Sequence, residues 1–427
     1  MRTPLHPAVH PAGYPAVDDL ERQARTLVAA APEVLRLRSV GESRAGRPLW
    51  LLSAGRGDRQ ILTVAGAHAN EPVGGASALR LARLFARRPE ELERLGCTWH
   101  FLLCLDPDGA HLAHGWTPEV PEPSLMECHR YFYRPAFASQ PESLPAPGEG
   151  REPLPESRAL VRLLDELRPV AQFTLHGIEV GGAFLMLTRE VPGVARAFRE
   201  TATRLRIPLD RHPVDGPDWQ LDPPGVLLLP GDRSERERDP SGFVAESTWL
   251  YPRRYGTLTA LIEAPAWCSP AVSDARPATA PDREIARVSE VLAGQTRELT
   301  AVLGERAVAA DVPEGLVPLH DAARELIDVA PSLVDTWAAE EHSTHQGHFA
   351  AIGISARRIP LRAAAMMCRA LARTAPETSD ALANLVREWC RQLEKSYDLR
   401  WVPVSAQTGL HVRTMIDTAR LVCATGG

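Results

Sequence analysis

One short segment limits the fold of this chain more than any other. It spans Ile61–Pro72 and reads ILTVAGAHANEP. Its apolar, partly β-branched start predicts a buried strand, and Gly66 permits a tight turn where that strand leaves the sheet. His68 and Glu71 follow the turn, at the edge where open α/β sheets place their sites. Because zinc accepts imidazole nitrogen and carboxylate oxygen, the segment indicates part of a metal site in an α/β fold.

Two later segments end predicted strands with side chains of the same kind. Ala171–Gly177 reads AQFTLHG and carries His176 just before a glycine, and Thr257–Pro265 reads TLTALIEAP and carries Glu263. A catalytic zinc uses three protein ligands and keeps a further position open, and two His with one Glu are a known set. A carboxylate is costly to bury without a partner or a task. We therefore predict a three-ligand zinc site with an additional acidic group beside it, as hydrolysis requires.

Five motifs of this chain resemble, in the same order, those of the zinc carboxypeptidase family, the carboxypeptidase A/B-like metallopeptidases and their bacterial relatives. They follow a predicted helix and a hairpin-like segment, Val40–Leu52, and the resemblance extends over roughly residues 17 to 300. The motifs are GAHANEP, DPDG at Asp106–Gly109 where the family usually has NPDG, PES at Pro155–Ser157, LHG and IEAPAW.

The resemblance implies a role for each matched residue. His68, Glu71 and His176 become the ligands of one zinc ion per chain. Glu263 becomes the general base and acid, which takes a proton from water and passes it to the leaving amine. The implied protein is a metallocarboxypeptidase, a zinc-dependent hydrolase that cleaves an amide bond at the C-terminus of a peptide or peptide-like substrate.

The resemblance also implies substrate-binding residues. The family grips a terminal carboxylate with an Asn-Arg pair and polarises the scissile carbonyl with another Arg. In the segment CHRYFYRPAF, His129 and Arg130 align with that pair, which leaves Arg134 for the carbonyl. Either Arg suits either task, because a guanidinium stays charged and matches a carboxylate. The mobile Tyr that the family has before its catalytic Glu implies Tyr251.

Two other functions remain open. Relatives of the aspartoacylase type share the HxxE pair and the distant His, so a zinc-dependent deacylase of a small N-acyl amino acid is an alternative. A second alternative is a non-catalytic binding scaffold, in which the metal domain only supports the helical tail. Cleavage of blocked peptides against that of N-acyl amino acids distinguishes these functions.

The predicted fold is α/β, with a mixed, largely parallel twisted sheet flanked by helices and a C-terminal all-helical domain. We expect a Pro-rich segment over residues 1–16, the catalytic domain over 17–305 and the helical domain over 308–427. The connection Cys268–Asp282 is rich in Pro, Ala and Ser, and apolar residues then recur at helical spacing. Helices with one apolar stripe must bury it, so the helical domain is a candidate surface for a homo-oligomer.

Composition is that of an ordinary globular protein, with 427 residues of which 44% are hydrophobic and 24% charged. The net charge of −6, with interspersed charges, argues against a nucleic-acid partner. No apolar run is long enough to span a membrane. The seven cysteines lack CxxC spacing and the start lacks a signal-peptide core, so we expect a cytoplasmic protein. Lys395 is the only lysine, which indicates a GC-rich bacterial genome.

Overall fold

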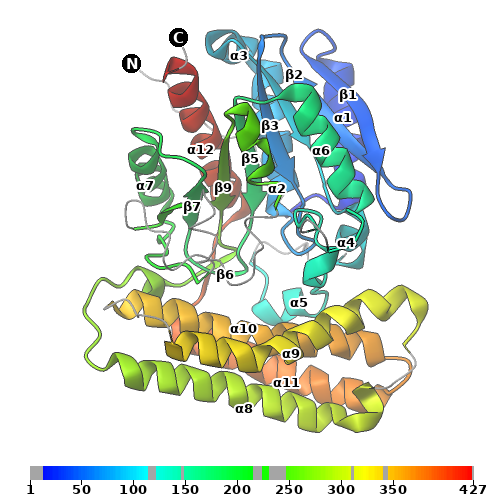
Figure 1. Ribbon diagram of the computed structural model, residues 1–427, viewed down its shortest axis with the longest axis vertical. Coiled ribbons are helices and arrows are strands. Elements are labelled where there is room, and N and C mark those ends of the chain that lie inside the picture. Colours follow the sequence, from blue (N-terminus) through cyan, green and yellow to red (C-terminus); the bar gives the residue numbers. More distant parts are fainter. Residues whose placement is uncertain are drawn as a thin grey trace.

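The computed structural model has an α/β part and a layer of long helices beside it (Figure 1). The structure describes residues 13–113, 122–145, 149–214, 224–229, 247–308, 312–339 and 345–425. Residues 1–12 of the predicted Pro-rich segment lie outside these ranges. Just after them, the Tyr14 hydroxyl donates a 2.7 Å hydrogen bond to Gln407 Oε1, near the other end of the chain.

An eight-stranded sheet forms the centre of the α/β part, in the order β1-β2-β4-β3-β5-β9-β7-β8. Four of its seven pairings are parallel: β3 with β4, β3 with β5, β5 with β9, and β7 with β8. The predicted mixed, largely parallel sheet is therefore confirmed. The strands are β1 Leu35–Glu42, β2 Pro48–Ala54, β3 Arg59–Ala65, β4 Cys97–Leu102, β5 Ala171–His176, β7 Phe184–Leu187, β8 Val226–Leu228 and β9 Leu258–Glu263.

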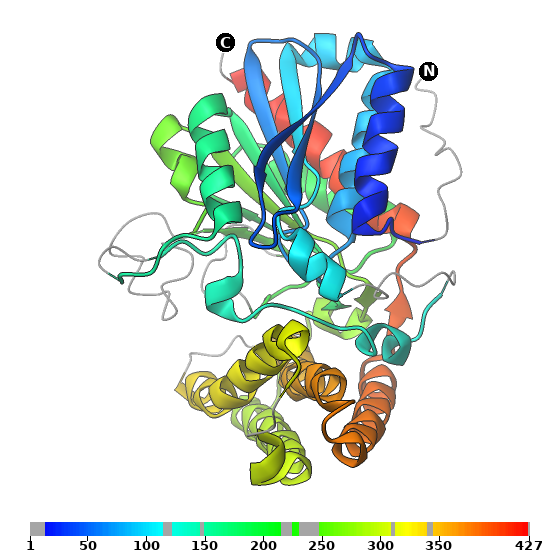
Figure 2. The same cartoon turned by 90° about the vertical axis from the view of Figure 1, so that its right-hand side faces the viewer.

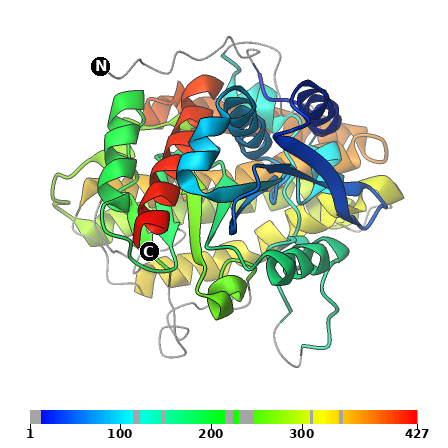
Figure 3. The ribbon, with the colours of Figure 1, turned by 90° about the horizontal axis from the view of Figure 1, so that it is seen from above.

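The side chains of the central strands alternate between two cores, as a strand period of two requires. Ile61, Phe173 and Leu175 face a core shared with several helices, whereas Leu62 and Val64 face a core shared with α6. Figure 3 shows the helices of the first core on one side of the sheet and α6 on the other. The first core is covered by α1 Val17–Ala30, α2 Val73–Arg87, α3 Pro89–Leu95, α7 Val194–Leu205 and α12 Val404–Thr425, and the second by α6 Pro155–Leu167.

Short helices connect the longer elements. They are α4 Pro107–Leu112, α5 Leu125–His129, and the 3-10 helices η1 Phe137–Ser139, η3 Tyr251–Tyr255, η4 Pro270–Ser273 and η5 Glu314–Leu316. Asp106 begins α4, where its side chain accepts a 2.9 Å hydrogen bond from the Gly109 amide. A Cβ at Gly109 would lie 2.2 Å from Asp106 Oδ2, so the DPDG turn requires glycine at this position.

Four long helices form a layer at one end of the sheet (Figure 2). They are α8 Pro281–Val308, α9 Val317–Ala339, α10 Gln346–Leu371 and α11 Pro376–Tyr397. The helix α10 contacts the other three, and most of its residues are buried. Its many Ala, Ile, Met and Leu residues are buried, as expected of a helix that packs against three others. The predicted helical region after the catalytic strands is therefore confirmed.

The chain leaves and re-enters the α/β part at one place. Strand β10, Trp267–Cys268, pairs with β11, Arg400–Trp401, and with β6, Val180–Gly181. After β11 the chain continues into α12, which packs against α2 and α7 rather than against the four-helix layer. The helix α8 packs with α9–α11, whereas α12 buries its apolar side against the sheet helices.

No helix within the described ranges is both long and apolar enough to cross a membrane.

The substitution Leu410→Ala tests whether α12 belongs to the α/β core. Leu410 is fully buried in the cluster that contains α2 and α7 side chains, so its truncation leaves a cavity. We expect the free energy of unfolding to fall by about 2–5 kcal/mol, measured by urea denaturation. Arg420→Ala, an exposed change in the same helix, should shift stability by no more than about 0.5 kcal/mol. Equal denaturation midpoints for Leu410→Ala and the unchanged protein would contradict this packing.

Candidate metal centre

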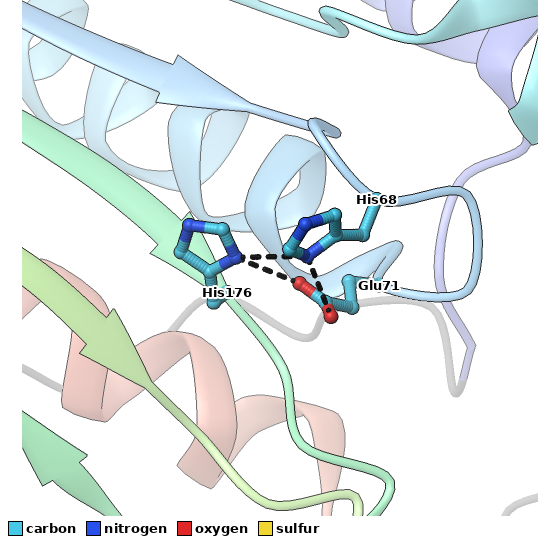
Figure 4. Close-up of side chains that lie close together, drawn as sticks. All are labelled: His68, Glu71 and His176. Carbon is cyan, nitrogen blue, oxygen red and sulfur yellow. Dashed lines mark hydrogen bonds and ion pairs between the residues drawn. The ribbon is translucent and has the colours of Figure 1, made fainter. Parts of the chain in front are cut away.

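Three potential ligands converge at the carboxyl ends of β3 and β5 (Figure 4). The chain leaves β3 through Gly66, whose φ is +61°, and a Cβ there would lie 2.8 Å from Cys104 Sγ. Glycine is therefore required at this turn, which leads directly to His68 and Glu71. His176 is the last residue of β5. One ligand atom from each of these three side chains lies within 4.8 Å of the others, and all three side chains are buried.

The donor atoms have the spacing of a metal site. His68 Nδ1 lies 2.9 Å from Glu71 Oε1 and 3.2 Å from His176 Nδ1, and His176 Nδ1 lies 3.0 Å from Glu71 Oε2. Zinc–nitrogen bonds of about 2.0–2.1 Å in a tetrahedron place the ligand atoms about 3.3 Å apart. Two imidazoles and one carboxylate are also the donor types that zinc accepts. The residues present therefore fit a zinc ion with three protein ligands.

The charges of the cluster favour a cation. Burial opposes ionisation of Glu71, but His68 and His176 hold its pKa well below the usual range. Burial and the Arg134 guanidinium lower the pKa of His68, so this imidazole is neutral at pH 7 and has a lone pair to donate. Burial opposes protonation of His176, yet Glu142 and Glu71 raise its pKa well above the ordinary value. Because a ligand must be deprotonated, metal binding displaces that proton.

Two residues that sequence analysis missed hold the His176 ring. The Thr174 hydroxyl lies 2.8 Å from His176 Nε2 and donates a 2.7 Å hydrogen bond to Glu142 Oε1. Glu142 Oε2 lies 3.4 Å from the same Nε2. Burial raises the pKa of Glu142, but the neighbouring His176 outweighs burial and lowers this pKa to about 2. These contacts engage Nε2 and leave Nδ1 facing Glu71.

The two missed residues differ in how visible they are in the sequence. Thr174 precedes His176 by two positions, so strand alternation places both on one face of β5 and could have identified it. Glu142 belongs to an irregular segment between η1 and α6, where no periodic pattern marks its position.

Glu263 lies beside the cluster. It ends β9 and pairs directly with His176 in the parallel register of β5 and β9. Neighbouring strands are about 4.8 Å apart, and directly paired residues project from the same face. Leu261, two positions earlier, faces the core on this side, whereas Ile262 faces the opposite one. The half-buried Glu263 carboxyl is thus on the same side of the sheet as the His176 ring.

Arg134 is also brought to the cluster. Its Nη1 donates a 3.1 Å hydrogen bond to Glu71 Oε1, and its Nη2 lies 3.2 Å from His68 Nε2. The side chain is 28% exposed, so the guanidinium lies between the buried ligands and solvent.

The residues predicted to bind the terminal carboxylate, His129 and Arg130, are not brought to the ligand cluster. His129 is fully buried; its Nδ1 donates to the Leu125 carbonyl at 2.9 Å, and its Nε2 lies 3.4 Å from Glu179 Oε1. Arg130 is exposed, and its guanidinium carbon lies 5.9 Å from the Tyr131 ring centroid. A buried partner, Glu179, thus lies beside the His129 ring, and the substrate-binding role of His129 stays a prediction. For Arg130, the described contacts include none with the ligands.

Tyr251 is not brought to the cluster either. It lies before the first residue of β9, whereas Glu263 is the last, and these strand ends are roughly 16 Å apart at about 3.3 Å per residue. Its hydroxyl donates a 2.9 Å hydrogen bond to Asp165, and the Arg254 guanidinium carbon lies 3.8 Å from its ring centroid. This side chain packs at the opposite end of the strand, and the catalytic role of Tyr251 stays a prediction from the sequence.

Comparison with known proteins supports the resemblance seen in the motifs. Residues 20–183 match the family model described as zinc carboxypeptidase, a span that contains His68, Glu71 and His176 and ends before Glu263. Carboxypeptidase SOL1 of Arabidopsis thaliana is 26% identical over 176 residues, which cover 39% of this chain and 33% of that protein. The chain therefore spans about a third of the length of this curated relative.

Solved structures show a weaker likeness. The metallo-carboxypeptidase from Burkholderia cenocepacia is 16% identical with a TM-score of 0.38, over 57% of this chain and 60% of its own. The carboxypeptidase A from Helicoverpa armigera is 13% identical with a TM-score of 0.39, over 60% and 66%. At these scores the structures add nothing to the sequence match. Over residues 20–183, which carry the three converging ligands, this chain is similar to the zinc carboxypeptidase family, whose metal is zinc.

Proposed function

We propose that this chain is a zinc-dependent hydrolase that cleaves an amide bond at the C-terminus of a peptide or peptide-like substrate. The observation that carries the proposal is the convergence of His68, Glu71 and His176 at one edge of the sheet, with Glu263 paired beside His176. The family match supports the same activity. Because the chain spans about a third of its curated relative, the activity of that relative is not transferred whole.

The chemistry needs a Lewis acid, a base and a cation. When bound, zinc polarises a carbonyl and lowers the pKa of water. Glu263 accepts the proton of the attacking water and passes it to the leaving amine. Arg134 lies where developing negative charge on the carbonyl oxygen can be stabilised, since its guanidinium stays charged. Thr174 and Glu142 orient the His176 ring and take no direct part in the reaction.

The alternative functions have less support. The family model and the curated relative are carboxypeptidases, and neither supports the deacylase or binding-scaffold alternatives. A peptide partner follows from the proposed activity. Homo-oligomer formation, cytoplasmic localisation and a bacterial source stay predictions from the sequence.

We further propose that the domains divide differently from the linear prediction. The helices α8–α11 form an inserted unit, supported by their mutual contacts and by the adjacent strands β10 and β11 through which the chain enters and leaves it. The α/β unit then contains both the segments before β10 and the final helix α12, supported by the contacts of α12 with α2 and α7.

Zinc content tests the proposed ligands directly. We expect about one zinc per chain in the purified protein, measured by elemental analysis, because neutral imidazole and ionised carboxylate bind zinc tightly at pH 7. His68→Ala and His176→Ala should each lose most of the metal. His111→Ala removes a partly exposed histidine elsewhere and should keep it. Full zinc content in both ligand variants would contradict the assignment of these residues as zinc ligands.

Glu263→Gln separates metal binding from catalysis. The substitution keeps the shape of the side chain but removes the proton acceptor, so kcat should fall about a hundredfold to ten-thousandfold while zinc content stays unchanged. Turnover of a C-terminally free peptide, followed by mass spectrometry, measures the loss. Glu166→Gln, an exposed change on α6, should leave kcat near that of the unchanged protein. Normal turnover by Glu263→Gln would show that this carboxylate is only structural.

A further inference from the structure

Two cysteines that are far apart in the sequence lie in contact with each other. Cys97 is the first residue of β4, and Cys423 lies in the last turn of α12. Their Sγ atoms are 3.4 Å apart, although 326 positions separate the two residues in the chain. We call them the dithiol pair. The two sulfur atoms need to approach by only about 1.4 Å more to reach the bonding distance of a disulfide.

The register of the sheet separates the dithiol pair from the candidate metal centre. Cys97 pairs with Arg59, the first residue of β3, in the parallel register of β3 and β4. The candidate ligands instead follow Ala65, the last residue of β3. At about 3.3 Å per residue, the two ends of β3 are roughly 20 Å apart. Chemistry at the dithiol pair therefore takes place at the amino ends of these strands, away from the zinc ligands.

The two thiols differ in their access to solvent. Cys97 is buried, with 1% of its surface exposed, whereas Cys423 is only partly buried. A small oxidant in solution therefore reaches Cys423 first, and the Cys97 thiol lies directly beside the sulfur that has been attacked. Cysteines that sense oxidants commonly have this arrangement, in which an accessible thiol reacts and a second thiol resolves the product.

The surroundings of the dithiol pair favour a thiolate at the accessible position. The hydrogen bond with the Cys97 thiol and the charge of the Arg59 guanidinium lower the pKa of Cys423 to about 7, although burial opposes this shift. The same hydrogen bond, together with burial, raises the pKa of Cys97. At pH 7 the accessible thiol is thus partly ionised, while the buried thiol keeps its proton. The thiolate is the form of cysteine that attacks an oxidant.

We propose that the dithiol pair is an oxidative modification site, at which hydrogen peroxide converts Cys97 and Cys423 into a reversible disulfide. The Cys423 thiolate attacks one peroxide oxygen, the O–O bond breaks, and the other oxygen takes up a proton and leaves as water. Cys423 is then a sulfenic acid. Cys97 attacks this sulfur and gives up its proton, and the sulfenic hydroxyl leaves as a second water. Both sulfur atoms are oxidised and the peroxide is reduced.

The disulfide fastens the last helix to the sheet. Near Cys423, the exposed Arg420 of α12 forms a 3.1 Å ion pair with Glu91 of α3, and exposed ion pairs contribute little to stability. A covalent bond between residues so far apart in the chain restricts the unfolded state much more strongly. Oxidation therefore holds the end of α12 against the first core, to which Cys97 belongs. This inference does not depend on the proposed hydrolase function.

Mass spectrometry of the oxidised full chain tests the proposal. The purified protein is treated with a small excess of hydrogen peroxide, its remaining thiols are alkylated, and it is digested without reductant. We expect a peptide pair joined through Cys97 and Cys423, which dithiothreitol separates. Cys368→Ser is the matched control and should keep the cross-link, because the partly buried Cys368 thiol instead donates to the Ser379 carbonyl at 3.3 Å. Alkylation of both thiols, or a sulfinic acid at Cys423 without a cross-link, overturns the proposal.

Variants separate the two steps of the reaction. Cys97→Ala removes the resolving thiol, so Cys423 should stop at the sulfenic acid, which dimedone captures. Arg59→Gln keeps both thiols but removes the cation, so the cross-link should form roughly threefold more slowly or slower still at pH 7. Circular dichroism reports on folding, and the cross-link in the unchanged chain decides the matter if Cys97→Ala does not fold. A folded Cys97→Ala protein that dimedone does not label after oxidation contradicts the proposed order of attack.

Thermal denaturation measures what the disulfide does to the fold. Without reductant, the midpoint of the cross-linked protein should lie roughly 3–6 °C above that of the reduced protein. Cys423→Ala removes one partner of the bond, so peroxide should give this variant no such rise. Zinc content should be equal in the oxidised and reduced forms, because the dithiol pair lies at the other end of β3 from the ligands. An equal or lower midpoint for the cross-linked protein contradicts the stabilising role of the disulfide.

Discussion

The parallel pairing of β3, β5 and β9 is the constraint on which the candidate site depends. Parallel strands in adjacent positions end at one edge of the sheet, so a single suitable residue at the end of each strand is enough to assemble a shared centre. The pairing brings Glu263 beside His176, and the turn at Gly66 carries His68 and Glu71 to them. A register shift of one residue would turn a strand-end side chain to the opposite face and separate the ligands.

Two buried clusters of charged side chains lie near that edge. The cluster around Glu71 and Glu142 has carboxylates that suit a metal cation. In the other, Glu179 forms ion pairs with Arg362 and Arg358 of α10. These ion pairs link the inserted helices to the segment that follows His176 in the chain.

Local signals in the sequence predicted the sheet, the three ligands and Glu263, because each depends on a short apolar strand with a functional residue at its end. The place of Tyr251 could not be predicted, because its nearness to Glu263 along the chain does not show that the length of β9 separates them. The place of His129 could not be predicted, because its partner Glu179 is distant in sequence. Glu142 was missed because irregular segments have no period. The place of α12 could not be predicted either, since an apolar stripe does not say which surface will cover it.

The late position of α12 also bears on synthesis of the protein. Ribosomes add about 5–20 residues each second, and domains generally fold as units when they emerge. Here the four-helix insertion is complete at Tyr397, before α12 has been made. The apolar side of α2 and α7 that α12 covers must therefore stay open while the insertion folds. A nascent chain that stalls in this interval exposes this apolar surface to solvent.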